Sequence, residues 1–270
     1  MSDKKNGKPD DKTVDDLFKA AAAEGTISPA SMQALELVDP GAQIQAALGV
    51  RALDVQSSEV VLVTIMPDDS GSIRFAGNAQ TVRDGHNLVL DALAASRQGG
   101  NVLVHTRYLN GTILFPYCAL DGAVRMDATN YDPNQGTPLY EQSVVLLGTV
   151  LAKAQELADA GVPVRTVTLL ITDGADEHSG RVRARDVAAL VGDLARAESH
   201  IVAAMGIDDG GNTDFRRVFR EMGIEDRWIL TPGNSPTEIR RAFQVFSQSA
   251  VRASQGGAVF SKTAVGGFAN

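Results

Sequence analysis

The sequence predicts an α/β fold: a doubly wound, mostly parallel six-stranded sheet in the order 3-2-1-4-5-6, with one antiparallel edge strand and helices on both faces. From Glu59 onward, short apolar runs alternate with helical patterns, and this alternation is typical of parallel sheets. Asn110-Gly111 joins two apolar runs and predicts a hairpin, which makes the third strand antiparallel. Before residue 58, apolar residues recur at helical spacing and predict an N-terminal helical extension.

The helical extension covers residues 14–57. Ser28 followed by Pro29, and Asp39 followed by Pro40, each predict a helix N-cap with proline in the first turn, so we expect two or three short helices. Their apolar stripe must be buried, either against the rest of the chain or in a partner protein. We favour packing within the chain, because an exposed stripe of this size is a liability in a soluble monomer.

Residues 58–254 form the expected α/β domain. Strands are expected at 60–66, 102–108, 112–118, 166–172, 200–206 and 227–230. Helices are expected at 79–97, 139–160, 184–197 and 214–222, with a last helix from residue 236. Ser235 to Glu238 has the pattern of a capping box with proline at the first helical position, which predicts where that last helix begins.

The two ends of the chain differ from this pattern. Residues 1–13 are polar and charged, a composition that cannot offset the entropy lost on ordering, so we expect disorder. Residues 255–270 are rich in glycine, and we expect a flexible tail. Phe260 and Phe268 in this tail are spaced like the anchors of a docking peptide.

Composition limits the location and the partners. The chain has a net charge of -8 and a pI near 5.0, which argues against nucleic acid or an anionic membrane as the main partner. Cys118 is the single cysteine, so an internal disulfide is excluded, as expected for a reducing compartment. The first residues have no apolar signal-peptide core, and no apolar run is long enough to span a bilayer. We therefore expect a cytoplasmic protein.

Oxygen-bearing side chains follow two of the expected strands. In a sheet of order 3-2-1-4-5-6 the first and fourth strands are neighbours, and ligands bind at their carboxyl ends. Asp68 follows the first strand and Asp173 the fourth, while Ser70, Ser72 and Thr137 add hydroxyl groups. Such a donor set suits a hard cation, Mg²⁺ or Mn²⁺, with Ca²⁺ also compatible. Taken alone, Asp-Ser-Gly-Ser could be just a turn, but the second aspartate and the threonine favour a metal site.

These residues carry a resemblance to a known family. Asp68-x-Ser70-x-Ser72, then a GTPL segment containing Thr137, then an ITDG segment containing Asp173, resemble the metal-ion-dependent adhesion site of von Willebrand factor A domains. The resemblance covers residues 59–253. It implies that the two serines and the threonine hold the metal directly or through water and that the two aspartates act largely through water. It also implies an open coordination position for the carboxylate of a partner protein, which is a binding device and not a catalytic one.

Two residues depart from the family pattern. Pro67 replaces an apolar strand residue, which is tolerable at a strand end where no ladder donor is needed. Asp69 adds a negative charge, which either raises cation affinity or faces solvent. We favour solvent, because residues i and i+2, and not i+1, share one side of an extended loop.

The last helix, IRRAFQVFSQSAVRAS, is similar to that of cytosolic bacterial members associated with tellurium resistance and stress response. By that resemblance, the partner is expected to present an acidic side chain and to be an AAA+ ATPase or a component of a stress complex. Arg181, Arg183 and Arg185 form the one basic cluster; it either attracts such a partner or is a solvated helix start, which we favour.

A metal-dependent hydrolase is the alternative function. His178 or Asp176, close after Asp173 in sequence, would then take a proton from metal-bound water. A lone histidine without an orienting partner is a poor general base, so we favour a solvated loop. The chain has no G-x-S-x-G elbow and no phosphate-binding G-x-x-x-x-G-K-[ST] loop. We therefore expect a binding module and not an enzyme.

Overall fold

The computed structural model describes residues 12–96, 99–208, 210–255 and 267–268. The strands are β1 (Val60–Met66), β2 (Val102–Arg107), β3 (Ile113–Ala119), β4 (Val164–Thr172), β5 (His200–Gly206) and β6 (Ile229–Leu230). The α-helices are α1 (Val14–Ala23), α2 (Pro29–Val38), α3 (Gly41–Ala47), α4 (Gly71–Phe75), α5 (Ala79–Ala94), α6 (Leu139–Asp159), α7 (Ala184–Arg196), α8 (Phe215–Glu221) and α9 (Pro236–Gln255). Four 3₁₀ turns are η1 (Ala52–Asp54), η2 (Gly99–Asn101), η3 (Leu120–Gly122) and η4 (Asp226–Trp228).

The sheet has the predicted order β3-β2-β1-β4-β5-β6. Neighbouring strands are parallel, except that β2 and β3 are antiparallel, so the predicted edge strand is confirmed. Asn110 and Gly111 form the predicted turn between these two strands, with Gly111 at a φ of 96° that favours glycine. Every residue of β1 and β2 is buried, because helices cover both faces of the sheet and leave no polar face.

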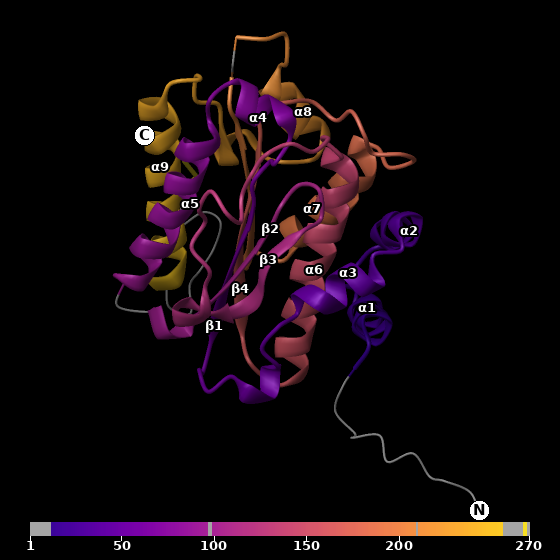
Figure 1. The fold of residues 1–270 in the computed structure, drawn as a ribbon. Helices are drawn as coiled ribbons and strands as arrows, with labels where there is room; N and C mark the ends of the chain where they lie inside the picture. The colour runs from indigo at the N-terminus through magenta and orange to yellow at the C-terminus, as the bar shows by residue number, and fades with distance from the viewer. Residues whose placement is uncertain (1–11, 97–98, 209, 256–266, 269–270) are drawn as a thin grey trace, which may run out of the picture.

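Helices α5 and α9 pack together on one face of the sheet, whereas α6 and α7 cover the other (Figure 1). Helix α5 carries its buried residues on one side, as expected for a helix with a solvent-facing side. Helix α6 is different, because nearly all of its residues from Gln142 to Leu157 are buried. A helix buried on all sides must be covered by a further layer of structure.

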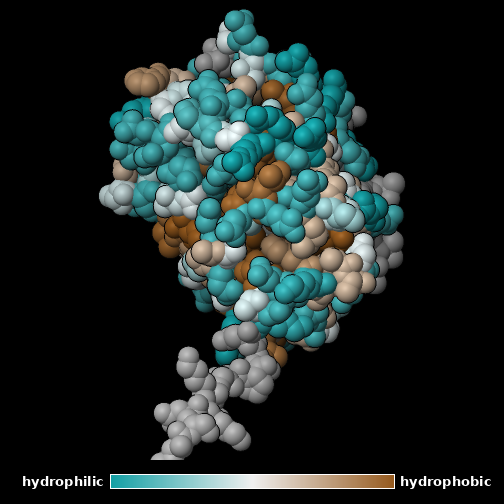
Figure 2. All heavy atoms as spheres, turned by 90° about the vertical axis from the view of Figure 1, so that its right-hand side faces the viewer, coloured by the Kyte–Doolittle hydropathy of each residue, from teal (hydrophilic) through white to brown (hydrophobic). Residues whose placement is uncertain are grey.

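That further layer consists of α1, α2 and α3, here named the N-terminal layer, which packs against the outer side of α6 (Figure 1). Gly148 of α6 allows the close approach, since a Cβ there would lie 2.7 Å from Leu35 Cδ2 and 3.0 Å from Ile44 Cδ1. Leu17 and Ile44 are fully buried in the shared core. The apolar stripe of the extension is therefore covered within the chain. The outer face of this region shows apolar patches among polar side chains (Figure 2).

Two local predictions about helix ends have different outcomes. Ser28 is the N-cap of α2, and its hydroxyl accepts a hydrogen bond from the Ser31 amide at 3.3 Å, as predicted. Asp39 is not an N-cap: it ends α2 in the left-handed conformation, with φ 47°, and Pro40 takes the N-cap position of α3. The prediction was wrong because two helices meet here with no linker, and the short side chain of aspartate tolerates the left-handed conformation.

The ends of the chain lie mostly outside the described residues, including residues 1–11 and Phe260. In the described part of the tail, Phe268 contacts the rings of Trp228 and Phe246, with centroids 5.4 and 6.4 Å away. The Phe268 amide also donates a hydrogen bond to the Arg227 carbonyl. One of the two expected anchors is thus docked on its own domain. None of the helices in the described part of the chain is long and apolar enough to span a bilayer.

Candidate metal centre

The carboxyl ends of β1 and β4 lie side by side, because the two strands pair in parallel up to Met66 and Leu170. The loops that follow them are joined by hydrogen bonds. The Ser70 amide donates to Asp68 Oδ1 at 2.7 Å, and the Oγ atoms of Ser70 and Ser72 are 2.8 Å apart. Ser72 Oγ then donates to Asp173 Oδ1 at 2.6 Å. Residues about 100 positions apart in sequence therefore form one continuous cluster.

Thr137 joins this cluster from a third segment. Ser70 forms a β-bridge with Gln135, and the Gly71 amide donates to the Gln135 carbonyl at 3.1 Å, which places the loop before α6 against the first loop. Thr137 Cγ2 lies 3.9 Å from the position that a Cβ on Gly174 would take, next to Asp173. All five candidate residues, Asp68, Ser70, Ser72, Thr137 and Asp173, therefore lie at this edge of the sheet, and we call them the candidate site.

The donor set fits a hard divalent cation. In octahedral coordination with Mg–O distances of about 2.1 Å, adjacent ligand oxygens lie about 3.0 Å apart. The two serine hydroxyls are 2.8 Å apart, the length of the hydrogen bond between them, which is also close enough for both oxygens to contact one cation. Within the described ranges, no group of three His, Cys, Asp or Glu residues could hold a metal ion, so a cation at this edge would depend on hydroxyl ligands. Hydroxyls and carboxylates favour Mg²⁺, Mn²⁺ or Ca²⁺ over softer metals.

Asp68 is fully buried and held on both carboxylate oxygens. Oδ1 accepts the Ser70 amide, and Oδ2 accepts the Thr172 hydroxyl at 2.6 Å. The hydroxyl of Tyr131, which is also fully buried, donates to the Asp68 carbonyl. Burial raises the pKa of Asp68 above its usual range, although the hydrogen bonds oppose this effect. A buried carboxylate of this kind gains from a nearby cation, which would favour its charged form.

Asp69 does not face solvent as expected, since it is only 4% exposed. Its Oδ1 accepts the Asn110 amide at 3.0 Å, and its carbonyl accepts the amides of Asn134 and Gln135 at 2.8 and 2.9 Å. Loss of solvation, with a smaller contribution from the charge of Asp68, raises the pKa of Asp69 to about 7. The expectation that Asp69 faces solvent was wrong. Its loop is held against the loops that contain Asn110 and Gln135, so side chains do not alternate between two sides as they do in an extended chain.

His178 and Asp176, the two candidates for a hydrolase, form hydrogen bonds that hold the loop before α6 in place. His178 Nδ1 accepts the Thr137 amide at 2.9 Å, which fixes the backbone at that residue. Asp176 Oδ1 accepts the Tyr140 amide at 3.1 Å, in the first turn of α6. Amides at a helix start have no partner within the helix, so Asp176 caps α6 from another loop. These contacts favour a structural role over proton transfer for both residues.

The basic cluster also has a local role. Arg183 Nη1 donates to the carbonyls of Gly180 and Val182 at 3.0 and 2.9 Å, directly before α7 begins. Arg185 lies 3.9 Å from Asp186 and is largely exposed. This arrangement is that of a solvated helix start, as favoured from the sequence.

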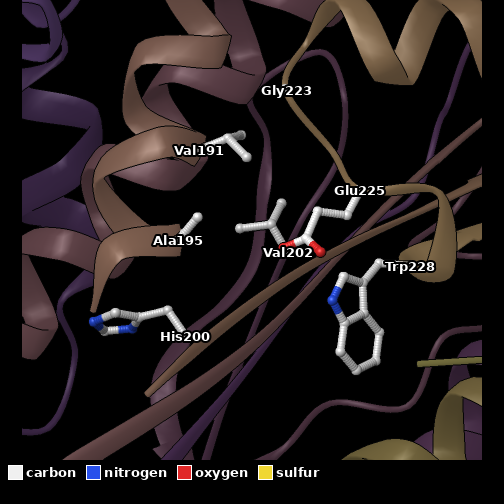
Figure 3. A pocket seen from close by; sticks show the side chains of 7 residues that line it. All are labelled: Val191, Ala195, His200, Val202, Gly223, Glu225 and Trp228. Carbon is white, nitrogen blue, oxygen red and sulfur yellow. The ribbon is translucent and has the colours of Figure 1, made fainter. Parts of the chain in front are cut away.

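The remaining histidines and cavities lie elsewhere. His86 and His105 are fully buried, and loss of solvation lowers the pKa of His86 to about 4 and that of His105 to about 3. A cavity of about 20 Å³ at the amino end of β5 holds at most one water. Figure 3 shows the residues that line it: Val191, Ala195, His200, Val202, Gly223, Glu225 and Trp228. A groove of about 570 Å³ lies at the end of α6 farthest from the candidate site, beside Leu48 and Leu53.

Sequence reasoning missed the residues that support the candidate site. Tyr131 lies in an irregular loop, where no periodicity or motif marks it. The role of Asp69 also depends on Asn110, 41 positions away. No local signal in the sequence could have revealed either contact.

Comparison with known proteins gives the fold but no family. No family model matches the chain, and no curated protein matches it. Among solved structures, the pilus adhesin SpaC of Lactobacillus rhamnosus GG in its open conformation matches with a TM-score of 0.52 at 15% identity. This match covers 73% of the chain but only 30% of the adhesin. Proximal thread matrix protein 1 of the mussel byssus, solved with a zinc-occupied MIDAS motif, is 15% identical over 72% of the chain and 46% of its own, with a TM-score of 0.46. At that score the second likeness carries no weight.

Proposed function

We propose that this chain is a von Willebrand factor A type module that binds a divalent cation and, through it, an acidic side chain of a partner protein. One observation carries the proposal: Asp68 accepts the Ser70 amide, the Ser70 and Ser72 hydroxyls are in contact, and Ser72 donates to Asp173, so their oxygens converge at the carboxyl edge of the sheet. The order of the sheet and the likeness of its fold to a pilus adhesin agree with this proposal.

Each candidate residue has a distinct part in the proposed site. Ser70, Ser72 and Thr137 offer neutral oxygens to the cation. Ser72 donates its proton to Asp173 and therefore accepts the Ser70 hydroxyl, which leaves its second lone pair for the cation. Asp68 and Asp173 supply negative charge and act largely through water. The bound cation would supply a positive charge with a coordination position for a partner's carboxylate. Mg²⁺ or Mn²⁺ is proposed as the ion, with Ca²⁺ also compatible.

Isothermal calorimetry of the metal-free protein tests the cation site. Mg²⁺ and Mn²⁺ should bind the wild-type chain, whereas Asp173→Ala should bind neither and should keep its melting temperature. Asp208→Ala is the matched control, because Asp208 is an exposed aspartate just after the neighbouring strand β5. Unchanged metal affinity in Asp173→Ala would refute the proposed site.

The partner is proposed to be a protein that presents an aspartate or glutamate. The sequence resemblance further favours a cytoplasmic AAA+ ATPase or a stress-complex component, including complexes linked to tellurium resistance. A captured partner should be released by EDTA and should rebind when Mg²⁺ is restored. Retention of the partner in excess EDTA would place the contact elsewhere on the molecule.

A further inference from the structure

We propose that Phe75 is a second contact of the partner site, and that the partner segment carries an apolar side chain two residues from its metal-binding acidic residue. This inference rests on the proposed function. Its starting point is exposure: Phe75 is 90% exposed, more than any other large apolar residue in the described chain. The others are Leu37, Leu53 and Val124, at 43, 66 and 42%. Of the four, only Phe75 lies within five residues of a candidate metal ligand.

Phe75 is placed beside the serine hydroxyls by helix geometry. It ends α4, and Ser72 lies one turn earlier, so their Cβ atoms are neighbours about 5–6 Å apart. The ring lies over Gly71, where a Cβ would be 3.4 Å from Phe75 Cε2. Gly71 separates Ser70 from Ser72, so the ring lies over the segment that carries the two hydroxyls that we assign to the cation.

The short helix that carries Phe75 is held from both sides. Ile73 is fully buried in the main core. Arg74 Nε donates to the Pro133 carbonyl at 2.7 Å, and its Nη2 pairs with Asp132 at 2.5 Å. Ile73 is thus anchored in the core and Arg74 to the neighbouring loop. The backbone of α4 is held in place, and Phe75 points outward from it. The backbone that carries the ring is therefore preformed, so that binding has to order the side chain but not the loop.

The spacing defines the chemistry of the partner. In an extended peptide, residues i and i+2 point to the same side and lie about 6.6 Å apart. This separation is close to that between Ser72 and Phe75 on α4. An acidic residue bound at the cation would thus bring the side chain two positions away over the Phe75 ring, while the intervening side chain points away. A leucine or another apolar residue at that position would cover the ring.

Three synthetic peptides test the spacing: acetyl-Gly-Glu-Gly-Leu-Gly-amide, acetyl-Gly-Glu-Leu-Gly-Gly-amide and acetyl-Gly-Glu-Gly-Gly-Gly-amide. Binding is measured by NMR titration of the isotope-labelled full chain in Mg²⁺ and in EDTA. The first peptide should bind about fivefold tighter than the other two, since a leucine is partly buried only in that register. Nuclear Overhauser effects should connect its leucine methyls to the Phe75 ring.

Two variants complete the test. Phe75→Ser should remove the preference for the first peptide while leaving Mg²⁺ affinity and melting temperature unchanged. Leu53→Ser, at an exposed leucine far from the candidate site, should keep the preference. Equal binding of the three peptides in Mg²⁺, or a preference that survives in Phe75→Ser, would overturn the proposed role of Phe75. Either result would leave the proposed cation-dependent binding intact. Peptide binding that persists in EDTA would instead refute the proposed function. Sedimentation that shows Phe75-dependent self-association would assign the ring to a second copy of the chain and also overturn the inference.

Discussion

The N-terminal layer and the candidate site are held in place by different forces. The layer is attached to α6 by aliphatic side chains such as Leu17 and Ile44, which are fully buried. The candidate site is attached by hydrogen bonds between loops, with Asp68 and Asp69 each accepting amides from the chain around them. Burial of an aliphatic side chain contributes about 1.5–3 kcal/mol, whereas one hydrogen bond contributes about 1 kcal/mol net.

This difference teaches where stability and binding reside in the molecule. Changes in the layer should lower the free energy of unfolding and leave cation affinity unchanged. Changes at the candidate site should lower cation affinity and have little effect on the free energy of unfolding. The reason is that Ser72 is exposed and its hydroxyl organises ligands more than it supports the fold. The following predictions test this separation, in order of their expected effect on the free energy of unfolding.

Ile44→Ala should have the largest effect. Ile44 is fully buried against Gly148 of α6, so the substitution leaves a cavity that the rigid helix cannot fill. We expect a loss of about 3 kcal/mol in urea unfolding, with Mg²⁺ affinity unchanged. Leu53→Ala, at a leucine that is 66% exposed, is the control and should change stability by less than about 0.5 kcal/mol. A loss of Mg²⁺ affinity in Ile44→Ala would show that the two regions are coupled.

Acid tests the core that both regions share. His86 Nε2 lies 2.9 Å from Thr106 Oγ1, and burial lowers the pKa of His86 to about 4 from an unfolded value of about 6.5. Folding therefore opposes protonation of His86. Its contribution to the free energy of unfolding is fully present above pH 6.5 and is lost as the pH falls towards 4. Between pH 6.5 and 5 the loss from His86 is about 1.6 kcal/mol.

Urea unfolding in EDTA across this pH range measures the effect without a bound metal. His86→Gln should show a shallower loss of stability with acid than the wild-type chain. Equal slopes in the two proteins would mean that His86 is protonated in the folded state without penalty.

Tyr131→Phe should have an intermediate effect. The substitution keeps the buried ring but removes the hydroxyl that donates to the Asp68 carbonyl. We expect a loss of about 1.5 kcal/mol, because that carbonyl is left without this donor in a buried loop. Mg²⁺ affinity should fall as well, since the backbone that carries Asp68 and Ser70 is less restrained. Calorimetry that finds full Mg²⁺ affinity would limit Tyr131 to a role in packing.

Ser72→Ala should have the smallest effect on unfolding, about 1 kcal/mol, because Ser72 is exposed and the substitution removes only its hydrogen bonds at the loop. Its effect on Mg²⁺ binding should be large, since the substitution removes a proposed ligand and the donor to Asp173. Ser58→Ala serves as the control, because Ser58 is an exposed serine just before the amino end of β1, at the opposite end of the sheet. A Ser72→Ala protein with reduced stability and normal Mg²⁺ binding would reverse the comparison.

Much of the fold could be predicted because its signals are local. Strand β1 is a nearly continuous apolar run and β4 is rich in β-branched and apolar residues, and alternation with helices leaves few topologies. The placement of Asp68 and Asp173 at one edge of the sheet could be predicted as well, since they follow neighbouring strands. Helix α4 was not predicted, because five residues are too few for a helical period to show.

The sequence by itself determined the order of the sheet, the hairpin at Asn110 and the types of residue at its carboxyl edge. Only the tertiary structure decided that Asp69 is buried, that Tyr131 supports Asp68 and that the N-terminal layer lies on α6. The physical reason is the range of the interactions. Periodicity and turn chemistry act over a few residues, whereas burial and hydrogen bonding at these positions depend on segments tens of residues away. Phe75 belongs to the second group, because exposure is set by what the rest of the chain leaves uncovered.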